Sequence, residues 1–199
     1  MTCMKILANI LTILVFLSAY TALYAQESGI SGGNTPVEIK IAQFDNENRL
    51  IRPSNIDEWI FLGASVGHGY PGEDEKEFNL ENPGKIQIIQ MEPSAYQFFK
   101  ENGYFVNGTM LSLSFYIPLG NPDPDIDGLA QGELNTFEIH LIDKNQYQDV
   151  RAFFLYETGD MAVSMVPAGN RCVSCHEAEG DYDGTFSQFY PVIREILAD

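Results

Sequence analysis

The residues with the clearest chemistry stand near the end of the chain. Cys172, Cys175 and His176 form the pattern Cys-x-x-Cys-His. This pattern is the attachment signature of a c-type haem, because two thiols about one helical turn apart can each bond to a vinyl group of the porphyrin. The histidine that follows directly can bind the iron from the same turn. The motif therefore predicts one covalently attached haem c, with Cys172 and Cys175 as its anchors and His176 as the proximal metal ligand.

A structural zinc site and a redox-active dithiol are the alternative interpretations of this motif. Four zinc ligands would require His68 and His140 from distant segments, whereas zinc spacing is convincing when a second compact pair is present. A thioredoxin-like dithiol follows a strand directly, but residues 167–170 read Pro-Ala-Gly-Asn and predict a loop. Cys3 is the only other cysteine. The lack of a second compact ligand pair, the loop before the motif and the number of cysteines together favour haem over both alternatives.

A carboxyl group on a predicted strand is the second candidate for chemistry. In residues 134–142, Glu138 and His140 alternate with Phe137 and Ile139. A strand with this pattern places Glu138 and His140 on one face and the apolar residues on the other. A carboxyl group near haem iron could exchange a proton with a bound nitrogen oxide, which makes Glu138 the candidate catalytic residue. The alternative is an ordinary solvent-facing pair on the polar side of a sheet.

The sixth iron position has weaker candidates. Met161 and Met165 are the methionines nearest to the motif, and His68 and His140 are the remaining histidines. In electron-transfer cytochromes the methionine ligand usually lies well downstream of the motif, and residues 177–199 contain no methionine. The pattern therefore favours an open sixth position over a coordinated one.

The first residues of the chain predict its compartment. Residues 1–25 read as a cleaved signal peptide, with Lys5 ahead of an apolar stretch at 6–17 that is too short for a confident membrane span. Residues 26–36 form a polar, glycine-rich linker, and the haem domain is predicted at 37–199. We therefore expect a periplasmic or otherwise exported protein with no stable membrane insertion after cleavage.

The composition narrows the range of partners. The chain has 28 acidic and 11 basic residues and a formal net charge of −17. Nucleic acid and anionic membrane surfaces would repel such a chain. The acidity is explained first by solubility, with a basic redox partner as the alternative.

The elements that position these residues read mainly as short strands. Alternating or apolar runs predict strands at 59–66, 86–91, 109–117, 134–142 and 152–156. Pro93 and Gly103 bracket a predicted helix at 93–100. Within 109–117, apolar residues alternate with Ser112 and Ser114, which predicts a half-buried strand. The fold class is therefore α+β, a mainly antiparallel β-sheet with a few short helices around a single haem.

Several separated motifs together resemble the cytochrome P-460 family, which includes the cytochromes c′-beta. The similar segments are Phe44-Asp45, residues 52–55, 59–63, 92–96 and 103–109, and most specifically 172–176 with 186–191. The resemblance covers nearly the whole mature chain. It implies a largely antiparallel sheet, a homodimer, and one haem c whose distal side is open to small ligands.

The resemblance also assigns roles to single positions. Members of the family that oxidise hydroxylamine have a lysine that cross-links to the haem edge, and here that position reads Leu113. An arginine expected on the preceding strand reads Gln87, whereas the distal carboxylate matches Glu138. Since leucine cannot form the cross-link, these departures weaken an assignment as a hydroxylamine oxidase.

These observations together predict an exported mono-haem c-type cytochrome with an open distal site. Its expected ligand is nitric oxide or a related small nitrogen species, which it either binds or transforms as a haem oxidoreductase. The alternative is an electron-transfer cytochrome with six-coordinate haem and a redox partner.

Overall fold

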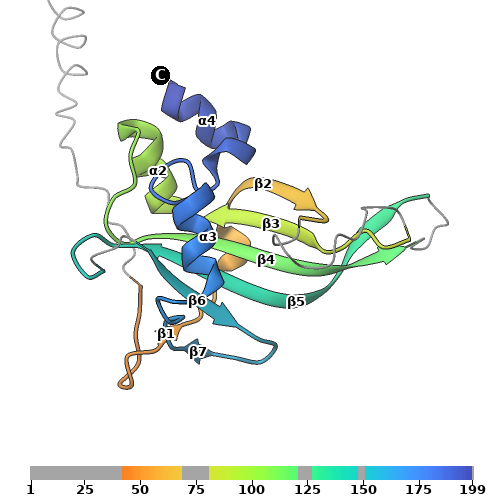
Figure 1. Cartoon of the computed structure of the whole chain (residues 1–199), viewed down its shortest axis with the longest axis horizontal. Helices are drawn as coiled ribbons and strands as arrows, with labels where there is room; N and C mark the ends of the chain where they lie inside the picture. The colour runs from red at the N-terminus through yellow and green to blue at the C-terminus, as the bar shows by residue number, and fades with distance from the viewer. Residues whose placement is uncertain (1–41, 69–80, 121–126, 148–150, 199) are drawn as a thin grey trace, which may run out of the picture. The chain divides into compact units, whose positions relative to one another are not determined.

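Five antiparallel strands form the main sheet of the computed structural model, which describes residues 42–68, 81–120, 127–147 and 151–198. Their order is β2-β3-β4-β5-β6, so each strand pairs with its neighbour in sequence (Figure 1). The strands are β2 (Ile60–Val66), β3 (Ile86–Met91), β4 (Thr109–Gly120), β5 (Leu129–Ile142) and β6 (Ala152–Tyr156). The two strands β1 (Leu50–Ile51) and β7 (Ala162–Val163) form a separate small sheet. The predicted α+β class, mainly antiparallel β with a few short helices, is confirmed.

Three α-helices and two short 3₁₀ helices complete the described part of the chain. They are η1 (Ile56–Glu58), α2 (Pro93–Asn102), α3 (Arg171–Glu179), η2 (Ser187–Phe189) and α4 (Pro191–Ala198). The start of α2 is fixed by Glu92, whose side chain accepts a hydrogen bond from the Ala95 N–H at 2.9 Å, and by Pro93 in its first turn. Gly103 ends α2 in the left-handed conformation, with φ of 72°. The predicted helix is therefore confirmed and continues two residues further.

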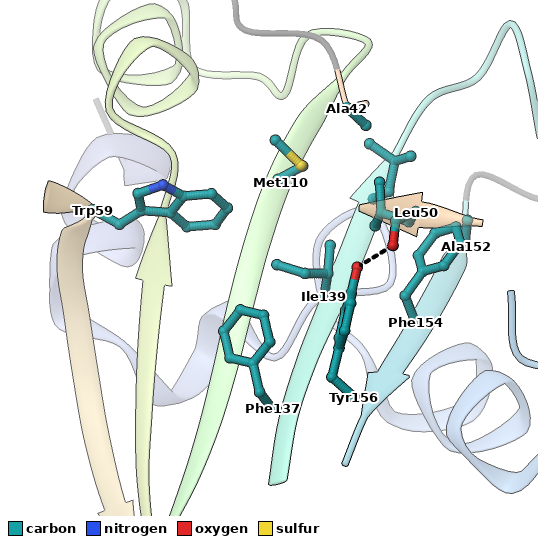
Figure 2. Packing of buried hydrophobic residues seen from close by; sticks show 10 residues of the cluster. Ala42, Leu50, Trp59, Met110, Phe137, Ile139, Ala152, Phe154 and Tyr156 are labelled. Atoms are coloured by element: carbon teal, nitrogen blue, oxygen red, sulfur yellow. Dashed lines mark hydrogen bonds between the residues drawn. The ribbon is translucent and has the colours of Figure 1, made fainter. Parts of the chain in front are cut away.

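Each face of the main sheet is covered by its own apolar cluster. The helix face packs against α2 and α4, and its buried residues include Leu62, Met91, Phe99, Leu111 and Ile193. The opposite face, called here the β1 face, packs against β1, and ten buried residues make up its cluster (Figure 2). These are Ala42, Leu50, Trp59, Met110, Phe137, Ile139, Leu141, Ala152, Phe154 and Tyr156. The sheet is therefore the middle layer of the fold.

The prediction that β4 is buried on one side is wrong. Ser112 and Ser114 alternate with the apolar residues as expected, but each is only 1% exposed. Their partners across the strand pair are Ile139 and Phe137, which belong to the β1-face cluster. The second layer covers this face, so small polar side chains lie in the interior.

The predicted signal peptide and linker, residues 1–25 and 26–36, lie outside the described residues. The described residues all belong to one compact unit that spans Val37–Asp199. None of the helices described in it is long and apolar enough to cross a membrane.

A buried hydrogen bond in the β1-face cluster gives a direct test of this packing. The Tyr156 hydroxyl donates to the Leu50 carbonyl at 2.9 Å, and Tyr156 is fully buried (Figure 2). Tyr156→Phe removes this buried hydrogen bond and is expected to lower the free energy of unfolding by about 1 kcal/mol. Tyr104→Phe, at a residue that is 50% exposed, serves as the control. Denaturant unfolding measures both, and equal stabilities would contradict the expectation.

Candidate haem site

The two predicted haem anchors lie on one turn of α3. The helix begins after Asn170, whose side chain accepts a hydrogen bond from the Cys172 N–H at 2.9 Å. Cys172 and Cys175 are partly buried, and neither is in a disulfide bond. Residues 167–170 form the predicted loop ahead of the helix. The sequence Cys-x-x-Cys thus presents two thiols separated by about 4.5 Å of helix rise.

The His176 ring is held by a backbone carbonyl in the turn that follows α3. Its Nδ1 lies 2.6 Å from the Gly184 oxygen. A carbonyl can only accept a hydrogen bond, so Nδ1 carries the proton and Nε2 keeps its lone pair. Burial lowers the pKa of His176, which favours the same neutral form. This is the tautomer and orientation that a histidine ligand needs, and it fits iron binding through Nε2.

A ring of aromatic side chains surrounds His176 on the helix face of the sheet. The ring centroids of Phe153 and Phe186 each lie 4.6 Å from that of His176. His140 lies at 5.4 Å and stacks on Phe153 at 4.3 Å. His140 on β5 is paired with Leu111 on β4 and with Phe153 on β6, so these three side chains share the helix face. The register therefore places the motif of α3 over β5 and β6.

The pair Glu138 and His140 does not face open solvent. His140 is 8% exposed, and burial, together with the nearby His176 and Arg151, holds its pKa well below the ordinary value. Glu138 is partly buried between Leu113 on β4 and Leu155 on β6. Burial raises the pKa of Glu138 to about 7, and the positive charge of Lys85 acts weakly in the opposite direction. The alternative of an ordinary solvent-facing pair is therefore wrong.

Glu138 lies one step along the strand from the group around His176. It is on the same face of β5 as His140 and two residues away, which corresponds to about 7 Å along the strand. Because the His140 ring contacts the His176 ring, the Glu138 carboxyl group, whose pKa is about 7, lies on the strand face that contacts the predicted iron ligand. The sequence alternation predicted that Glu138 and His140 share a face, and the structure adds His176 to them.

The two positions at which the resemblance implied a lysine and an arginine also lie on the helix face. Leu113 is directly opposite Glu138 in the strand pair. Gln87 is buried, accepts a hydrogen bond from the Ser65 hydroxyl at 3.0 Å and donates one to the His68 carbonyl at 2.8 Å. The Gln87 side chain on β3 is therefore hydrogen-bonded to Ser65 near the end of β2 and to His68, which follows that strand.

The other predicted ligand candidates are scattered over the described part of the chain. Met161 is 70% exposed and Met165 43% exposed, and they flank β7, whose Val163 packs against the β1-face cluster. His68 lies beside Phe189, with ring centroids 5.3 Å apart. Within the described residues, no group of three or more His, Cys, Asp or Glu side chains is arranged to hold a metal ion. The ligand set of the zinc alternative is thus not assembled there.

Sequence reasoning missed three residues that build the site. Gly184, Phe153 and Phe186 contact His176 from the turn after α3, from β6 and from the segment before η2. Phe186 stands in the closing run of the resemblance, which was the available signal for it. Phe153 is an ordinary apolar residue of a strand, and its sequence context does not distinguish it from core residues.

Comparison with known families identifies the chain. The family model described as Cytochrome P460 matches residues 53–187, which include Glu138 and the whole Cys-x-x-Cys-His motif. The chain belongs to this family. The family binds haem c, so this protein is a haem c cytochrome. A search of the curated proteins found no match. The two thiols on one helical turn and the oriented His176 ring fit this cofactor.

Proposed function

We propose that this cytochrome is exported and that it binds or transforms nitric oxide or a related small nitrogen species at an open iron position. In this proposal Cys172 and Cys175 anchor the haem and His176 is the proximal ligand. The observation that carries it is the position of Glu138, a partly buried carboxyl group with a pKa of about 7 on the face that contacts His176. A group that titrates near neutral pH is suited to hold or release a proton in general acid–base chemistry.

When bound, haem c supplies an iron that can take up a small nitrogen-containing ligand and exchange an electron with it. The chain supplies orientation, because the hydrogen bond from His176 to Gly184 fixes the ring. It supplies apolar neighbours for Glu138 through Leu113 and the partly exposed Leu155, and these favour an uncharged diatomic ligand over an anion. It supplies a proton at the Glu138 carboxyl group below about pH 7.

Leu113 separates this proposal from hydroxylamine oxidation by a cross-linked haem. The side chain opposite Glu138 in the strand pair carries no amine, so it cannot form a covalent bond to the haem edge. We therefore propose chemistry at an unmodified haem c. Binding without turnover and turnover assisted by Glu138 are the two forms that this chemistry can take.

Optical spectroscopy of the haem-loaded protein tests the proposal. We expect a five-coordinate, high-spin ferrous spectrum that changes when nitric oxide or carbon monoxide is added, because the sixth position is open. The ferric and ferrous proteins are recorded before and after each gas. A low-spin ferrous spectrum that responds to neither gas would overturn the proposal and establish the electron-transfer alternative.

A further inference from the structure

Arg151, the residue before β6, lies against the turn that holds His176. Gly184 has φ of 70°, and a Cβ built on it would lie 2.9 Å from Arg151 Cδ and in still closer contact with Nε. The arginine side chain therefore occupies the space beside Gly184 that a larger residue would fill. The oxygen of the same glycine accepts the Nδ1–H of His176. Arg151, Gly184 and His176 thus form a continuous series of contacts.

The guanidinium group of Arg151 is paired with a carboxylate at Nη1 and is buried at Nε. Its Nη1 forms an ion pair with Glu177 Oε1 at 3.3 Å, and Glu177 directly follows His176 in α3. The side chain of Arg151 is 22% exposed and that of Glu177 50% exposed. Arg151 Nε is buried and has no hydrogen-bond partner among the groups that the structure describes. A buried donor without a partner is costly, so its retention beside His176 requires a reason.

The charge of Arg151 lies near His176, because its side chain packs against Gly184, whose oxygen accepts the Nδ1–H of His176. The same positive charge opposes any further positive charge placed near His176. An iron bound at Nε2 gains one positive charge on oxidation from ferrous to ferric, so a neighbouring cation favours the ferrous form.

We propose that Arg151 is a positioning residue for the proximal side of the haem, which holds the Gly184 carbonyl against His176 and raises the reduction potential of the iron. This inference rests on the assignment of His176 as the proximal ligand in the proposed function. Arg151 acts in two ways, by contact with Gly184 and by its charge. Glu177 moderates the charge because it pairs with the guanidinium group from the solvent side.

Reduction potentials of haem-loaded variants test this assignment. In Arg151→Gln we expect the ferrous-to-ferric ratio at a fixed potential to fall about tenfold, which corresponds to a potential about 59 mV lower for a one-electron couple. Arg151→Lys keeps the charge and should retain most of the potential. Glu177→Gln removes the opposing charge and should shift the potential in the other direction. Arg49→Gln is the matched control, since Arg49 pairs with Asp45 in the turn before β1.

The frequency of the iron–histidine stretching band in the ferrous protein reports the contact with Gly184. We expect Arg151→Gln to shift this band, because the carbonyl that accepts the Nδ1–H is no longer held in place. Two results would show that the charge of Arg151 does not raise the reduction potential. One is an equal shift in Arg151→Gln and Arg151→Lys, and the other is a shift in Arg151→Gln no larger than that in Arg49→Gln. If Arg151→Gln does not fold, Glu177→Gln decides the question, and an unchanged potential in that variant would overturn the proposal.

The failure of this inference can be distinguished from a failure of the proposed function. If His176 does not bind the iron, the iron–histidine band is absent from the unmodified protein. If His176 binds the iron but Arg151 is only a packing residue, the band is present and the potentials of the charge variants match that of the control.

Discussion

His176→Gly is expected to abolish iron–histidine bonding in the haem-loaded protein, because it removes the oriented ring whose Nδ1–H donates to Gly184. Cys172 and Cys175 remain, so haem that has been attached stays covalently bound. The iron–histidine stretching band of the ferrous protein should be lost completely. Added imidazole should restore it, since a free imidazole can enter the space that the side chain leaves. Resonance Raman and optical spectra of the purified variant provide the measurement.

His68→Gly is the matched control for this experiment. His68 is exposed, and its ring lies next to Phe189, which stacks on Phe186 and not on His176 itself. We expect the control to keep the spectra of the unmodified protein. An unchanged iron–histidine band in His176→Gly, or its loss in His68→Gly, would show that the proximal ligand has been assigned wrongly.

Glu138→Gln is expected to slow the conversion of a bound nitrogen species by about 100-fold or more while the haem content stays unchanged. The reason is that an amide keeps the size of the carboxyl group but cannot transfer its proton, and general acid–base groups contribute about 10²–10⁴-fold. The rate in the unmodified protein should change with pH around a midpoint near 7, where the pKa of Glu138 lies. The variant should lose this midpoint. Rates of nitric oxide or hydroxylamine consumption across pH 5–9 measure both effects.

Glu138→Gln is expected to lower the rate of turnover but to raise the stability of the protein, and the two effects can be measured separately. The pKa of Glu138 is raised from its ordinary value of 4.5 to about 7 in the folded protein. Between these two values the folded state binds more protons than the unfolded state, so stability falls as the pH rises from about 4.5 to 7. Glu138→Gln should remove this decline and stabilise the protein above pH 7 by about 2–3 kcal/mol, the figure being reduced for the partial exposure of the group.

Glu133→Gln is the control for both effects, because Glu133 stands on the same strand but is exposed. Denaturant unfolding at pH 5 and pH 8 measures the stability effect. If the free energy of unfolding changes by the same amount between pH 5 and pH 8 in the unmodified protein and in Glu138→Gln, folding does not raise the pKa of Glu138. If turnover persists in Glu138→Gln at its original rate, the residue has no part in proton transfer.

Most of the secondary structure could be read from the sequence because its signals are local. Pro93 and Gly103 bracket α2, since proline fits the first turn of a helix and glycine adopts the left-handed conformation that ends one. The strands β3 and β6 were predicted with their observed bounds from apolar runs of the right length. The strands β4 and β5 extend further than predicted, to Gly120 and back to Leu129, because their pairing with each other continues where the apolar alternation weakens.

Some local elements were not predicted. The helix α4 begins at Pro191 and packs Ile193 against the helix-face cluster. Its proline start and its apolar residues at helical spacing were usable signals. The strands β1 and β7 consist of two residues each, and such a short pair has no periodicity that a sequence could reveal.

The haem motif was determined by the sequence alone, because Cys172, Cys175 and His176 lie within one turn of a helix and their chemistry depends on that spacing. The alternation of β5 likewise determined that Glu138 and His140 share a face. It could not determine what covers that face, since a period of two is the same whether the polar side meets solvent or another layer. Tertiary packing decided this for both faces of the sheet: α3 brings His176 against His140 on the helix face, and the layer on the β1 face buries Ser112 and Ser114.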